Sequence, residues 1–163
     1  MKTLEDLFEH QLKDLYSAEN QLIAALPKVI GRVSDSNLKK AIEDHLEETK
    51  EQKKRLQEVC EDLDISPSGE KCKAMEGLLK EADEFLEEAT DSDVVDAGII
   101  ANAQRIEHYE ISGYGTAVRY AKELGHIEIA RVLQTTLDEE YAADNKLDDL
   151  AENRLNQKAM DHS

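Results

Sequence analysis

Acidic side chains interrupt the apolar pattern of this 163-residue sequence at four separated places. Each interruption lies inside a run of apolar residues spaced three and four apart, which is the spacing of one helical face. The interrupting residues are Glu19, Glu48, Glu107, Glu110, Glu140 and Asp144. The carboxylates therefore share the faces that would otherwise be entirely apolar.

If these carboxylates meet inside a helical bundle, they cannot all remain bare anions, because each buried ion costs several kcal/mol unless it is compensated. Protonation of some of them is one solution, and a pair of divalent metal ions is the other. Helical bundles build such pairs from a Glu on each of two helices and a Glu-x-x-His motif on each of the other two. Ligation by carboxylates without thiolates favours iron or manganese over structural zinc.

The depth of each carboxylate along its helix supports a meeting. Glu110 and Glu140 each stand 15 residues from Gly125, so we expect them to face each other at one level. Glu19 lies about 16 residues before a turn near residue 35, and Glu48 lies about 13 residues after it. These two therefore differ in depth by about one helical turn.

Long helices must carry these residues. The chain has 4% aromatic residues, no Trp, two Pro and seven Gly, and this composition favours an all-α protein. We expect a single domain over 1–163, with long helices at about 3–33, 36–64, 93–124 and 127–155 and a short helix at about 71–89. Ser34 or Ser36 is expected to cap the second helix. Two hairpins joined by a long connection predict a ferritin-like four-helix bundle, with a crossover connection that carries the short extra helix.

Charge and targeting signals exclude several classes of protein. The formal net charge of -17 repels phosphate backbones and anionic lipid surfaces, so we expect no nucleic-acid partner and no membrane partner. The N-terminus has acids where a signal peptide needs an apolar segment, which predicts a cytoplasmic protein with Cys60 and Cys72 reduced. The sequence has no GxSxG motif and no glycine-rich phosphate loop that follows a strand.

Five sequence runs add a resemblance to a known family. They are LYSAENQL, HLEETKEQ, KCKAMEGL, QRIEHYEISGYGTA and LDEEYAADNKL, in this order along the chain. Together they resemble the YciF-type stress-induced proteins of bacteria, a branch of the ferritin-like superfamily, over nearly the whole sequence. The resemblance implies a ferritin-like bundle, a homodimer and a rubrerythrin-like centre with two metal ions.

The resemblance also implies roles for individual residues. Glu19, Glu107 and Glu110 match terminal or alternative metal ligands, whereas Glu48 and Glu140 match the carboxylates that bridge the two ions. Glu139 is an alternative to Glu140, but Glu140 falls on the stripe of apolar residues.

The sequence departs from the superfamily where its two histidine ligands are usual. Position 51 is Glu51 and position 143 is Ala143, each three residues after a predicted bridging Glu. His45, one turn before Glu48, is a candidate substitute, although a hydrogen-bonded core role is equally compatible with its position. Gln52 and Asp144 follow the bridging residues by four, so either can bind metal or support a ligand.

The remaining polar aromatic and histidine residues are expected to have simpler roles. Tyrosines near the centre can donate a hydrogen bond or an electron, but core packing is the favoured role. These are Tyr16, Tyr109 and Tyr114. The histidines outside the carboxylate face are expected at the surface, namely His10, His108, His126 and His162.

Two functions follow from this reading. The first is a dinuclear iron or manganese protein of the stress response, with peroxidase or ferroxidase chemistry that reduces peroxide or dioxygen. The second is a non-catalytic, dimeric or partner-binding bundle that retains a vestigial metal site. The absent Glu-x-x-His histidines keep both functions open.

Overall fold

The computed structural model describes residues 1–161 except for the side chain of Arg154, so His162 lies outside the described residues. Its helices are α1 (Leu4–Ile30), α2 (Ser36–Asp62), α3 (Lys73–Glu88), α4 (Ser92–Glu123), α5 (Ile127–Leu150), the π-helix η1 (Ala151–Leu155) and α6 (Asn156–Met160). All elements in the described part of the chain are helical, which confirms the predicted all-α class. No helix within residues 1–161 has the length and apolar character needed to cross a membrane.

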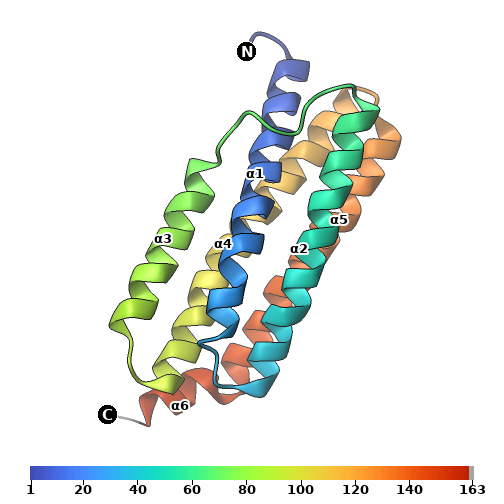
Figure 1. Cartoon of the computed structure of the whole chain (residues 1–163). Coiled ribbons are helices and arrows are strands. Elements are labelled where there is room, and N and C mark those ends of the chain that lie inside the picture. The colour runs from blue at the N-terminus through green and yellow to red at the C-terminus, as the bar shows by residue number, and fades with distance from the viewer. Residues whose placement is uncertain (162–163) are drawn as a thin grey trace.

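The four long helices form a bundle of two hairpins (Figure 1). Around the bundle, α1 packs on α2, α2 on α5, α5 on α4, and α4 on α1. The crossover helix α3 lies outside the bundle beside α1 and α4 (Figure 1). The predicted four-helix bundle with a crossover connection is therefore confirmed.

The helices begin at residues whose side chains accept hydrogen bonds from the first turn. Thr3 and Asp6 form a capping box at the start of α1. Asp35 caps α2 by accepting from the backbone N–H groups of Asn37 and Leu38, so the predicted cap at Ser34 or Ser36 is wrong. A carboxylate accepts both hydrogen bonds and also favours the positive end of the helix dipole.

The last long helix differs from the predicted continuous segment at 127–155. The α-helix ends at Leu150, and a π-helical turn leads into α6.

The turn between α4 and α5 is made by Gly125, whose positive φ of 80° suits a residue without a Cβ.

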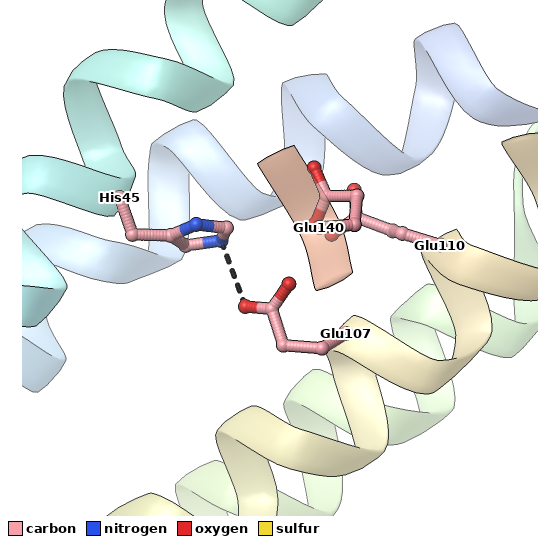
Figure 2. A group of neighbouring side chains, drawn as sticks. All are labelled: His45, Glu107, Glu110 and Glu140. Carbon is pink, nitrogen blue, oxygen red and sulfur yellow. Dashed lines mark ion pairs between the residues drawn. The ribbon is translucent and has the colours of Figure 1, made fainter. Parts of the chain in front are cut away.

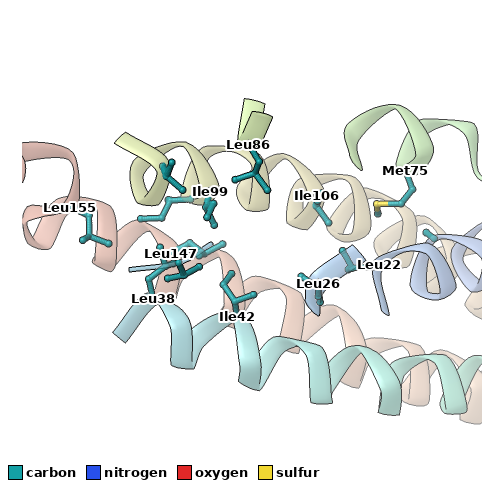
Figure 3. Packing of buried hydrophobic residues seen from close by; sticks show 14 of the residues in the cluster. Leu22, Leu26, Leu38, Ile42, Met75, Leu86, Ile99, Ile106, Leu147 and Leu155 are labelled. Carbon is teal, nitrogen blue, oxygen red and sulfur yellow. The ribbon is translucent and has the colours of Figure 1, made fainter. Parts of the chain in front are cut away.

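Two apolar cores occupy the two ends of the bundle. The core at the bundle end near the chain's C-terminus (Figure 1), called here the C-terminal core, includes Leu22, Leu38, Ile42, Ile99 and Leu147 and is shown in Figure 3. The core at the end near the N-terminus (Figure 1), called here the N-terminal core, includes Phe8, Leu12, Leu15, Leu56 and Leu133. Along each long helix, the switch from one core to the other falls where the buried polar residues stand. A polar layer thus separates the two cores. Its buried residues are Glu19, His45, Thr49, Gln52, Glu107, Glu110, Thr136 and Glu140.

Both cysteines lie in these cores. Cys60 belongs to the N-terminal core and Cys72 to the C-terminal core, and both are free and buried. Their burial fits the structural role that the sequence predicts for them. Burial raises the pKa of the Cys60 thiol to about 11, so the thiol stays protonated and unreactive at neutral pH.

Candidate metal centre

Four side chains from three helices converge in the polar layer. His45 comes from α2, Glu107 and Glu110 from α4, and Glu140 from α5, and Figure 2 shows them facing one another. Each offers one ligand atom, and these atoms all lie within 4.8 Å of one another. All four residues are buried. The group has the ligand types and the spacing to hold a metal ion.

The helical geometry explains the convergence. Glu107 and Glu110 are three residues apart, so both project from one face of α4. His45 reaches them from α2, the helix diagonally opposite α4 in the bundle. Side chains from diagonal helices can meet only at the bundle axis, so the group lies at the centre of the cross-section.

Glu19 of α1 is the fourth carboxylate of the polar layer. It is fully buried, and the hydroxyl of Tyr114 donates a hydrogen bond to its Oε1. Burial raises its pKa well above the ordinary value, and the nearby charge of Glu140 raises it further. Tyr114, for which packing was the favoured role, therefore also fixes a predicted ligand.

The polar atoms of this layer are mostly unsatisfied. Buried polar groups in proteins are almost always hydrogen-bonded, so each exception needs an explanation. Among residues 1–161, the buried side-chain atoms without a hydrogen-bond partner are Glu19 Oε2, His45 Nδ1 and Nε2, Gln52 Oε1, Glu107 Oε2, and both carboxylate oxygens of Glu110 and of Glu140. All of them belong to the polar layer. A bound cation would account for ligand atoms that gather there without partners from the chain.

His45 and Glu107 lie close together without forming a hydrogen bond. Nε2 of His45 is 3.2 Å from Oε1 of Glu107, the contact drawn as a dashed line in Figure 2, yet neither ring nitrogen has a hydrogen-bond partner within the described residues. Burial lowers the pKa of His45, so its imidazole is neutral at neutral pH. A neutral imidazole with an unused nitrogen is the form that binds metal.

Burial also controls the two carboxylates of α4. It is the main cause that raises the pKa of Glu107 and of Glu110 well above the ordinary value, and the charge of Glu140 adds to both effects. Without metal, the folded protein therefore favours the protonated form of these carboxyl groups more than water does. A cation in their midst would replace the protons and stabilise the ionised form.

Two predicted ligands, Glu48 and Asp144, lie outside the polar layer. Glu48, expected among the inward carboxylates, is exposed and lines a cavity beside the group, although its pKa is raised first by partial burial and then by the charge of Glu139. Asp144 lies 2.9 Å from Nε2 of the exposed His108 and accepts a hydrogen bond from Gln104. Asp144 is thus held in a surface network.

The other histidines that were expected at the surface differ in exposure. His108 is exposed, as predicted. His10 and His126 are half-buried, because His10 pairs with Glu70 and the ring of His126 stacks on Phe8 with centroids 6.3 Å apart.

Glu139 and Glu140, the two alternatives for one predicted ligand, differ in their surroundings. Arg55 donates to both oxygens of Glu139, at 2.6 and 2.8 Å, and Gln52 Nε2 donates to the same carboxylate at 3.2 Å. Glu139 is therefore occupied by partners at the edge of the polar layer, whereas Glu140 is fully buried within it. The structure therefore buries Glu140, as the spacing of the apolar residues predicted.

A cavity of about 230 Å³ opens from solvent toward the group, between α2 and α5. It is lined by Ala41, Ile42, Asp44, His45, Glu48, Glu107, Ala142, Ala143, Lys146 and Leu147. Lys146 and Asp44 lie 3.6 Å apart and connect the two helices. The sequence offered no sign of this cavity, since Asp44 and Lys146 read as ordinary polar residues of exposed helix faces.

Comparison with known proteins places the chain in a family. Residues 3–160 match the family described as a domain of unknown function, DUF892. Protein YciF of Escherichia coli strain K12 is 48% identical over 160 residues, which cover 98% of this chain and 96% of that protein.

Solved structures agree with this assignment. The crystal structure of the E. coli stress protein YciF has a TM-score of 0.91 and 47% identity, over 96% of this chain and 99% of that one. YcfI of Rhodopseudomonas palustris has a TM-score of 0.88 and 49% identity, over 91% of this chain and 94% of the other. Protein XCC3681 of Xanthomonas campestris, at 22% identity over 98% of this chain and 99% of its own, shares the fold with a TM-score of 0.76. The resemblance carried by the five sequence runs is thus confirmed, and the chain belongs to the DUF892 family as a relative of the stress protein YciF.

Proposed function

We propose that this YciF-like protein binds two divalent metal ions, iron or manganese, in the polar layer and acts on peroxide or dioxygen. The observation that carries the proposal is the set of buried ligand atoms without hydrogen-bond partners in the described chain. Burying these atoms costs free energy on folding unless a bound cation or protons compensate their charge.

Charge balance supports two ions over one. The layer holds four buried carboxylates, Glu19, Glu107, Glu110 and Glu140, which carry about four negative charges when ionised. Two divalent ions neutralise that charge, whereas one ion would leave about two buried negative charges uncompensated. The neutral imidazole of His45 adds a ligand without changing the balance.

The arrangement of the carboxylates suggests which of them are shared. His45 and Glu107 lie together, and Glu19 lies close enough to Glu110 and Glu140 for their groups to shift its pKa. We therefore assign Glu110 and Glu140 as the ligands common to both metal positions. Glu48, predicted to bridge, is assigned instead to the solvent side, where it lines the cavity.

The chain's own residues prepare the layer for this role. Tyr114 holds Glu19 in place, and Arg55 holds Glu139 and, through it, Gln52. Oxygen-rich ligation with one imidazole suits iron or manganese. A ferrous pair, when bound, would supply two electrons to reduce one peroxide with two protons to two waters.

Metal content is the direct test of this proposal. Metal-free protein would be loaded anaerobically with ferrous or manganous ions, desalted, and measured by mass spectrometry against folded protein concentration. We expect about two metals per chain in the wild type, and a large loss in Glu140→Gln, which removes one shared ligand. Glu139→Gln is the matched control, because this neighbouring carboxylate lies outside the group. Absence of bound metal in the wild type would overturn the proposal.

One observation favours a second, non-catalytic function. The positions of the two usual histidine ligands hold Glu51 and Ala143, which lowers the nitrogen content of the site. In this alternative the protein binds metal for stability only and acts as a homodimer or by binding another protein. Peroxide consumption that follows metal content supports the first function, whereas a fully loaded protein without turnover supports the second.

A further inference from the structure

The cavity between α2 and α5 has features that a packing defect would not have. Its inner end is formed by His45 and Glu107, whose side chains are only 8% and 2% exposed. Both ring nitrogens of His45 and Oε2 of Glu107 have no hydrogen-bond partner within the described residues. The cavity therefore ends at buried polar atoms that are free to receive a ligand.

Small side chains on facing helices create the space. Ala41 lies on α2, and Ala142 and Ala143 lie on α5. Ala143 is three residues after Glu140, so it lies about one turn further along the same side of α5. A longer side chain at 143 would project into the cavity, and the methyl group of alanine leaves it open.

The size of the cavity limits what can enter. Its volume of about 230 Å³ equals the liquid volume of about eight water molecules. Engineered cavities of about 150 Å³ already accept a benzene molecule. Peroxide and five-membered heterocycles fit, whereas most metabolites and any peptide are too large.

The charges of the lining select among small molecules. Asp44 and Glu48 at the mouth and Glu107 at the inner end are carboxylates, and Lys146 is the one cation among the described lining residues. Lys146 already pairs with Asp44, so a small anion would find no free cation in the described lining and would meet the exposed carboxylate of Glu48. The neutral imidazole of His45 offers one unpartnered acceptor nitrogen, which favours an uncharged molecule that can donate a hydrogen bond, and the apolar walls of Ile42 and Leu147 tolerate a flat apolar face.

The mouth of the cavity can open at little cost. The Asp44 and Lys146 side chains that pair across it are 47% and 52% exposed. An ion pair this exposed contributes little to stability, so a neutral molecule can pass between the two side chains.

We propose that this cavity is a binding pocket for a small uncharged hydrogen-bond donor, of peroxide to imidazole size, that reaches His45 and Glu107 from solvent. The pocket deepens the proposed function, because such a molecule would arrive beside the proposed metal ligands. The binding itself depends on the cavity and not on metal, which allows the two proposals to be tested separately.

The test uses imidazole at pH 8, where it is uncharged, and acetate as an anion of similar size. Ligand-observed NMR on the metal-free protein measures binding of each probe to wild type, Ala143→Leu and Ala24→Leu. Ala143→Leu fills the cavity, and Ala24→Leu adds the same side chain at an exposed position of α1 outside the cavity. Ala142→Leu, at an exposed position of the lining, is a second filling variant if Ala143→Leu lacks native helicity by circular dichroism.

We expect imidazole to bind the wild type and Ala24→Leu equally. Imidazole should bind the filling variant at least tenfold more weakly than the wild type. Acetate should bind the wild type at least tenfold more weakly than imidazole does. Equal imidazole binding by the filling variant, or none by the wild type, would overturn the pocket. A parallel titration of the cobalt-loaded protein, followed by visible absorption, separates the two proposals. If imidazole binding is lost in Ala143→Leu but the protein binds no cobalt, the pocket is supported and the metal centre is contradicted. If the protein binds cobalt but not imidazole, the metal centre is supported and the pocket is contradicted.

Discussion

The polar layer and the apolar cores on either side of it are built from the same four helices but satisfy opposite requirements. In the N-terminal core, residues such as Leu12 and Leu56 are fully buried and contribute apolar area. In the polar layer, Glu110 and Glu140 are equally buried, yet their carboxylate oxygens have no hydrogen-bond partner in the described chain. The cores thus supply the stability that allows the layer to remain unsatisfied, which is a common arrangement in binding sites.

The largest effect of a single substitution is expected from damaging a core. Leu12→Ala removes a fully buried leucine from the N-terminal core and should lower the free energy of unfolding by about 2–5 kcal/mol. Denaturant unfolding measures this loss. Metal content per folded chain should remain at the wild-type level, because Leu12 is not part of the polar layer. A loss of metal in the folded variant would show that core and layer are not separable.

A pH series should reveal the layer in the metal-free protein. The pKa values of Glu19, Glu107 and Glu110 are raised in the fold, so the folded state retains protons that the unfolded state releases above about pH 4.5. Stability then falls as pH rises, by about 1.4 kcal/mol per pH unit for each retained proton.

The pH window above the ordinary histidine pKa of about 6.5 separates this effect from that of His45. The pKa of His45 is lowered, so it destabilises the fold only at lower pH, where the unfolded state gains a proton that the fold rejects. Chemical denaturation at several pH values in this window should give a falling free energy without metal and a much flatter profile with metal bound. Parallel profiles in the two forms would contradict the assignment of these carboxylates to the centre.

A smaller effect is expected where the layer meets the N-terminal core. Tyr114→Phe keeps the packing but removes the donor to Glu19, so it should cost about 1–3 kcal/mol of stability and weaken metal binding. Tyr120→Phe, on the same helix and half-buried, serves as the comparison. If both variants bind metal with wild-type affinity in a titration, Tyr114 has a packing role alone.

The smallest effect is expected at the surface, outside both regions. Lys28 and Asp83 lie 2.7 Å apart and link α1 to α3, but each side chain is about half exposed. Lys28→Ala should therefore change the free energy of unfolding by roughly 1 kcal/mol or less, and added salt should reduce the difference. A larger loss would mean that the docking of α3 contributes more to the fold than its exposed contacts indicate.

The sequence predicted the helices and the layer well, because both depend on periodicity. Steps of three and four residues identify the inward face of each helix, and they correctly favoured Glu140 over Glu139. The same spacing did not predict whether residues at the edge of an inward face are buried. Glu48 is three residues after His45 and so lies roughly 60° around the helix from it. At that angle the packing of α5 decides whether a side chain points inward or toward solvent.

By itself, then, the sequence determined the all-α class, the order of the helices and the buried positions of Glu19, Glu107, Glu110 and Glu140. These follow from local periodicity and turn residues, which each segment carries independently. The tertiary structure decided that Tyr114 holds Glu19, that Asp144 lies in a surface network and that a cavity leads to His45. Each of these needs side chains from different helices to meet, and their relative rotation is fixed only when the bundle packs.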